Sequence, residues 1–235
     1  MKYLICLFTY LFAVTFVVAA QDNNTLTREE MHRISQDIHS GGITVKHAND
    51  YRGSPYFAKW QKGYIILKGG AKSNTLPIRY NMQKNAVEYI KNKKRFIISA
   101  KKIDGFVIKE KNGNITFKNG FKTNQGHINQ NTLLRVIYNG NTKLLAHYTS
   151  KLLKNLASYE SADTKNRFDN HIRYYIQESD GTFQKVKLKK KDILNALRKN
   201  RKKVAQYANK HNLSFKKETD LKDILKYYDS INSAS

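Results

Sequence analysis

Cysteine and proline are nearly absent from this chain of 235 residues. The sole cysteine, Cys6, lies in an apolar N-terminal stretch, so a chain without that stretch has neither a disulfide framework nor a structural thiolate metal site. The only prolines are Pro55 and Pro77. A chain of this length can bury a core without covalent cross-links, and we expect one domain or one domain with an appendage.

Acidic residues are also scarce, with 18 Asp and Glu against 43 Lys and Arg, and the formal net charge is +25. Such an excess favours anionic partners such as nucleic acid, anionic lipid or acidic polysaccharide. A lysine-rich solvated surface without any ligand gives the same composition, and the sequence leaves both interpretations open.

Recognised catalytic motifs are missing as well. The chain has no G-x-S-x-G, no H-E-x-x-H and no glycine-rich phosphate loop. Its seven histidines do not show the spacing expected of a metal site. We therefore predict no catalytic, cofactor-binding or metal-binding residue, and keep a hydrolase assembled from distant carboxylates as a less favoured alternative.

The N-terminus carries the pattern of a secretory signal. Lys2 precedes an almost wholly apolar run over residues 3–18, and small side chains lead up to polar Gln21. We predict a signal peptide over residues 1–20, cleaved after Ala20. A retained membrane anchor is the alternative, but the run is short for a span. The expected location is the periplasm, the outer-membrane periphery or the exterior.

The remaining chain divides into three parts. Residues 21–62 predict a short helix at 25–39, with capping-box spacing of Thr27 and Glu30, followed by a loop. Residues 63–190 hold short runs of β-forming residues between turn dipeptides. They predict an antiparallel β-meander, as a sandwich or a partly open barrel. Residues 191–235 predict a basic helical hairpin packed on it. The fold class is α+β.

Two hairpins can be assigned a register. A two-residue turn at Asn112-Gly113 would pair Ile108 with Phe117. At the second hairpin, a three-residue loop over 179–181 with Gly181 at positive φ pairs Tyr174 with Val186 and separates the apolar and lysine-bearing faces. Between these hairpins, residues 150–159 predict a helix and residues 160–170 an exposed connection.

The C-terminal part predicts two amphipathic helices. The first is capped by Asp192 and runs to about Ala208, and Arg201 falls in its apolar stripe, where we expect it to snorkel or to pair with Asp223. The second begins near Thr219.

Basic residues around this hairpin and the preceding strands are the one feature of the sequence that indicates a binding site. Tyrosines among them could stack on a base or a sugar. The candidate anion-binding residues are Arg173, Tyr175, Lys185, Lys187, Arg198, Lys199 and Lys202. A solvated polar face on a core-packing helix is the alternative.

Three short stretches, residues 53–56, 76–81 and 213–221, with Tyr227 and Tyr228 after the last, carry a resemblance. Together they resemble an uncharacterised family of exported β-rich proteins from Bacteroidetes-type bacteria. The resemblance implies a β-rich envelope protein closed by two helices. It implies no activity and no site residue.

The sequence thus predicts an exported, non-catalytic cell-envelope module that binds a protein partner or an anionic surface polymer. A secreted nucleic-acid-binding protein is the first alternative and a hydrolase the second. We expect no cofactor and no transmembrane span after cleavage of the signal.

Overall fold

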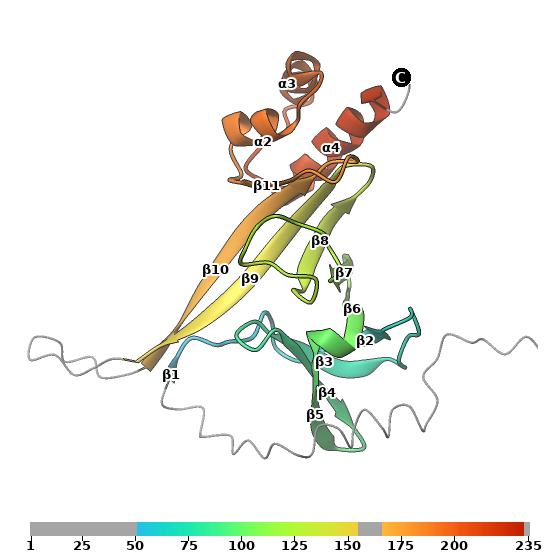
Figure 1. Ribbon diagram of the computed structural model, residues 1–235, viewed down its shortest axis with the longest axis vertical. Coiled ribbons are helices and arrows are strands. Elements are labelled where there is room, and N and C mark those ends of the chain that lie inside the picture. Colours follow the sequence, from blue (N-terminus) through green and yellow to red (C-terminus); the bar gives the residue numbers. More distant parts are fainter. Residues whose placement is uncertain (1–50, 155–165, 233–235) are drawn as a thin grey trace, which may run out of the picture.

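The computed structural model describes residues 51–154 and 166–232. The predicted signal peptide at 1–20 and the predicted helix at 25–39 lie outside these ranges. Within them the fold is α+β, with one open, mixed sheet of eleven strands and helices gathered at one end of it (Figure 1).

The strands are β1 (Tyr51–Arg52), β2 (Gln61–Leu67), β3 (Leu76–Asn81), β4 (Ala86–Lys91), β5 (Lys94–Ser99), β6 (Ile103–Glu110), β7 (Gly113–Lys118), β8 (Leu134–Asn139), β9 (Lys143–Leu153), β10 (Asn166–Gln177) and β11 (Phe183–Val186). A single 3₁₀ turn, η2 (Ala100–Lys102), precedes β6. The helices are α2 (Lys190–Ala196), α3 (Arg201–Lys210) and α4 (Glu218–Asn232).

The strand order is β1-β10-β9-β8-β7-β6-β2-β3-β4-β5, and β11 pairs with β10. Most neighbours are sequential antiparallel hairpins, as a meander predicts, but β6 crosses back to pair with β2, and β1 runs parallel to β10. All described strands belong to one sheet, so the predicted sandwich of two facing sheets is wrong.

Two glycines let the central strands β2, β6 and β7 approach closely. A Cβ at Gly63 would collide with the carbonyl oxygen of Val107, and one at Gly105 with the carbonyl oxygen of Phe117. Any larger residue here would force the paired backbones apart. The pairing of β6 with β2 therefore depends on glycine at positions 63 and 105. Turn dipeptides in the sequence do not indicate this pairing.

The predicted register of the first hairpin is wrong by two residues. The structure pairs Phe106 with Phe117 and Ile108 with Ile115. Residues 111–112 form the turn, and Gly113 follows them with φ at +121°. A turn followed by a glycine at positive φ is a common hairpin arrangement. A two-residue shift preserves side-chain parity, so Phe106, Ile108, Ile115 and Phe117 lie on the same face in either register.

The register of the second hairpin is confirmed. Tyr174 lies opposite Val186, Gly181 has φ at +84°, and the backbone N–H of Glu178 donates to the carbonyl of Thr182 across the three-residue loop at 3.0 Å. Val186 is buried and Tyr174 packs against the core as predicted, whereas Ile172 on the same face is half exposed.

The predictions between these hairpins fail wherever they can be judged. Ser150–Leu153 belong to β9 and not to a helix, and residues 166–170 belong to β10 and not to a connection. The two strands pair from Lys143 opposite Gln177 to Leu153 opposite Arg167. Cross-strand hydrogen bonds satisfy the backbone of this long arm, and they override the local helical pattern.

The first predicted C-terminal helix is broken in two. α2 ends at Ala196, Asn200 takes a left-handed φ of +53°, and α3 then begins at Arg201. Asp192 is not the N-cap, because the helix starts after Lys189 and the Asp192 carboxylate instead accepts from the backbone N–H of Lys187 at 3.2 Å. The break allows residues on both sides of it to reach the same core.

The second predicted helix is confirmed as α4, whose buried stripe is Leu221, Ile224, Leu225 and Tyr228. The hydroxyl of Tyr174 donates to Glu218 at its start, and the hydroxyl of Tyr138 donates to buried Asp229 near its end. These bonds fix α4 on the Tyr174 face of the sheet. In the described part of the chain, no helix is long and apolar enough to cross a membrane.

Candidate anion-binding site

The opposite face of the β9–β11 sheet carries a second, smaller core. Tyr175, which is 0 % exposed, packs there in one cluster with Leu145 and Phe183. Ile128, from the β7–β8 connection at 119–133, belongs to the same cluster. This connection therefore covers a face that strand alternation places away from the helices. Tyr175 is not available for the predicted stacking on a base or sugar, because it is buried.

His127 lies at the edge of this covered region. A turn closed by the backbone N–H of Ile128 on the carbonyl of Gln125, at 2.8 Å, sets its position. The side chain is exposed, and its Nε2 lies 2.6 Å from the hydroxyl oxygen of Tyr175. The ring of His147 on β9 lies 6.3 Å away, centroid to centroid.

His147 is the most perturbed titratable group of this region. Its side chain is 8 % exposed, and its Nδ1 has no hydrogen-bond partner among the described residues. Burial lowers its pKa to about 4, and positive charge on His127 and Arg173 acts in the same direction. Arg173 is its direct cross-strand neighbour on β10. A neutral imidazole at pH 7 follows.

Three groups with positive or protonatable side chains lie near one another on the Tyr175 face, with His127 as their common neighbour. Burial lowers the pKa of His127, and the charges of Arg173 and Lys185 lower it further. Lys185 is the cross-strand neighbour of Tyr175 on β11. Within residues 51–154 and 166–232, no ion pair involves Arg173 or Lys185. We call His127, Arg173 and Lys185 the basic site.

A cleft of about 850 Å³ adjoins the basic site, between the β7–β8 connection and the β10–β11 hairpin. Lys122 and Gln125 line one side, and Gln184 and Lys185 the other, so Lys185 belongs to both the cleft and the basic site. Asp180 and Arg198, which pair with each other, also line the cleft. Amide side chains beside ammonium groups can donate several hydrogen bonds to an anionic chain. Through Lys122, the cleft continues the positive surface of the basic site onto the β7–β8 connection.

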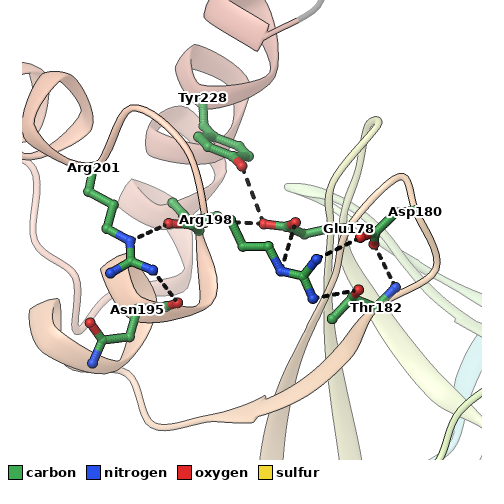
Figure 2. Close-up of polar contacts among 8 residues, drawn as sticks. Glu178, Asp180, Thr182, Asn195, Arg198, Arg201 and Tyr228 are labelled. Carbon is green, nitrogen blue, oxygen red and sulfur yellow. Dashed lines mark hydrogen bonds and ion pairs between the residues drawn. The ribbon is translucent and has the colours of Figure 1, made fainter.

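Arg198, predicted as an anion ligand, is held by the protein itself (Figure 2). Its guanidinium donates to Asp180 and to the Thr182 hydroxyl at 2.9 Å each, and lies 3.8 Å from Glu178. A hydrogen bond from the backbone of Thr182 is the main cause that lowers the pKa of Asp180, and Arg198 adds to it. The two carboxylates offset the charge of Arg198 and join the helix break to the hairpin loop.

Arg201 also has a structural role. Its Nε donates to the carbonyl of Leu197 at 2.9 Å, and a second nitrogen donates to the carbonyl of Asn195 at 3.3 Å (Figure 2). These carbonyls belong to the C-terminal end of α2, where backbone acceptors lack helical partners. Arg201 thus caps the helix that precedes it, in place of the predicted snorkelling or pairing with Asp223.

The remaining predicted residues divide into two groups. Lys187 is exposed directly after β11, in alternation with Lys185. Lys199 and Lys202 are exposed at the helix break and on α3, and Lys199 lines a separate cavity of about 210 Å³ next to Tyr228. The structure therefore brings Arg173 and Lys185 together and leaves the helical lysines outside the basic site.

Sequence reasoning missed Lys122, His127 and His147. The first two lie in the β7–β8 connection, which has no periodicity from which a position could be inferred. His147 could have been found, because its alternation with buried Leu145 places it on one face of β9. The β9–β10 register was the missing information.

This geometry predicts a loss of stability in mild acid. The pKa of His147 falls from 6.5 to about 4 on folding, so the unfolded chain binds a proton between these values that the folded chain does not. Stability is then complete above pH 6.5 and decreases by up to about 3 kcal/mol as the pH falls to 4. Urea unfolding at several pH values measures this, and His147→Gln should flatten the profile. Exposed His171→Gln is the control, and an equal flattening there would contradict the assignment.

Comparison with protein-family models, with curated proteins and with solved structures finds no match to this chain. Among the described residues there is also no group of three or more His, Cys, Asp or Glu side chains that could hold a metal ion. The basic site and the adjoining cleft are therefore the features that bear on function.

Proposed function

We propose that this protein is an exported, non-catalytic module of the cell envelope, and that it binds an anionic surface polymer at the basic site. The polymer would carry phosphate or sulfate groups. The observation that carries the proposal is the convergence of Arg173, Lys185 and His127, from two strands and a loop, without a carboxylate partner in the described part of the chain.

The chemistry of these groups suits an oxyanion. A guanidinium donates in a planar fork that fits phosphate and sulfate, and an ammonium adds a point charge. Lys122 and Lys185 continue the positive surface along the cleft, which suits a chain with repeated charges. The apolar stretch at 1–20 and the resemblance to exported β-rich proteins support the cellular location.

The test compares two variants that lose the same charge. Arg173→Gln/Lys185→Gln removes two cations from the basic site, and Lys199→Gln/Lys202→Gln removes two outside it. Affinity for heparin, as a sulfated probe, is measured at several salt concentrations. We expect the negative slope of the logarithm of the association constant against log salt to become shallower by about 2 in the first variant and to stay near the wild-type value in the control.

Equal losses in both variants would mean that the net charge alone causes retention, and the proposal would then be wrong. Unchanged binding in both, with the wild type insensitive to salt, would favour a protein partner instead. Parallel titrations with polyphosphate and single-stranded DNA separate a surface polymer from nucleic acid. Circular dichroism checks that both variants are folded.

A further inference from the structure

The hairpin of β4 and β5 ends in a concentrated group of cations. Residues 91–95 read Lys-Asn-Lys-Lys-Arg, and four of these five side chains are basic. Lys91 is partly exposed, and the other three cations are exposed at the turn and on the edge strand β5. No ion pair of the described residues involves any of the four cations. We call residues 91–95 the hairpin tip.

Two features of the hairpin tip lower its stability. Asn92 and Lys93 both have positive φ, at +50° and +59°. A turn of this type prefers glycine at its second position, and lysine there is strained. Lys91 and Lys94 also lie directly opposite each other in the register, where like charges repel.

A lysine-rich edge strand discourages pairing between sheets, and this would account for Lys94. It does not account for Lys93, which lies in the turn and outside the strand. Residues that break local rules without a structural gain mark functional positions. The repulsion between Lys91 and Lys94 is reduced when an anion lies across the tip, and the positive φ of Lys93 holds its side chain at the turn beside them.

Figure 1 shows β4 and β5 at one end of the long axis, whereas β11, which carries Lys185, lies in the other half, next to the helices. We infer that the hairpin tip is a second contact for phosphate or sulfate groups, so that one protein molecule bridges two anionic chains. The bridging part of this inference rests on the proposed function, because the basic site supplies the other contact. The hairpin tip itself does not depend on it.

The experiment uses Lys93→Gly/Lys94→Gln as the tip variant. It removes two charges and places glycine where φ is positive, so we expect it to be no less stable than the wild type. Calorimetry with a short heparin oligosaccharide should give two bound per wild-type molecule and one per tip variant. Turbidity with long-chain heparin should fall at least about fivefold in the tip variant, because the link between chains is lost.

Arg173→Gln/Lys185→Gln should also bind one oligosaccharide, and Lys199→Gln/Lys202→Gln should bind two. A tip variant that keeps both the stoichiometry of two and the turbidity would overturn the inference, while the basic site would stand. If instead Arg173→Gln/Lys185→Gln keeps two bound and only the tip variant loses one, the proposed function fails and the hairpin tip stands.

Discussion

Glu88→Gln is expected to destabilise the fold by about 3–5 kcal/mol, since it leaves Arg79, whose side chain is only 15 % exposed, without its counter-charge. Glu88 is 7 % exposed, and it lies opposite Arg79 in the β3–β4 register. Its Oε2 accepts from two nitrogens of Arg79, at 2.9 and 2.6 Å. Its Oε1 accepts from the hydroxyl of Tyr56 at 2.9 Å. The guanidinium carbon of Arg79 also lies 3.6 Å from the ring centre of Tyr56 and 4.3 Å from that of Trp60.

Guanidinium denaturation of wild type and variant measures this effect. Lys68→Gln is the control, because it breaks an ion pair with Asp104 of 2.9 Å in which both side chains are about half exposed, and it should cost no more than about 1 kcal/mol. A double variant, Arg79→Met/Glu88→Met, should recover much of the loss, because apolar side chains can replace a buried pair. Equal effects of Glu88→Gln and Lys68→Gln would refute the assignment of a buried pair.

Leu197→Ala is expected to cost about 2–5 kcal/mol. Leu197 is 0 % exposed, and it lies between α2 and α3, where the predicted continuous helix is broken. Its N–H donates to the carbonyl of Ile193, and its own carbonyl accepts from Arg201. Truncation therefore opens a cavity at the junction that holds two helices in their relative orientation.

Denaturant unfolding followed by circular dichroism measures the loss. Lys202→Ala on α3 is the matched control, and its exposed side chain should change stability by about 0.5 kcal/mol or less. A loss below about 1 kcal/mol for Leu197→Ala would mean that the helix break contributes little to the core.

Features that depend on local sequence pattern were predicted correctly. Features that depend on pairing between distant segments were not. The loop ending at Gly181 was predictable, because a shift of one residue would have buried Lys185. The buried stripe of α4 followed from its periodicity. By contrast, β9 continues through Ser150 because β10 pairs with it across a long separation, and no local signal reports that pairing.

In the candidate site, too, local pattern predicted some residues correctly and long-range contacts placed the others. Alternation placed Arg173 and Lys185 on one face, and the structure keeps them together. Composition could not show that Asp180 would hold Arg198, because the two residues meet only when the helix break packs against the hairpin loop. It also could not place His127, whose connection folds over Tyr175.

The most direct test of the account is the location of bound anion in solution. Backbone and imidazole NMR signals of the wild type are followed during titration with a short heparin oligosaccharide. We expect large shifts at His127, Arg173 and Lys185, beside those of the hairpin tip, and an increase in the pKa of His127 as the anion offsets the nearby positive charge. Shifts confined to Lys199, Lys202 and the helices, with His127 unchanged, would contradict it.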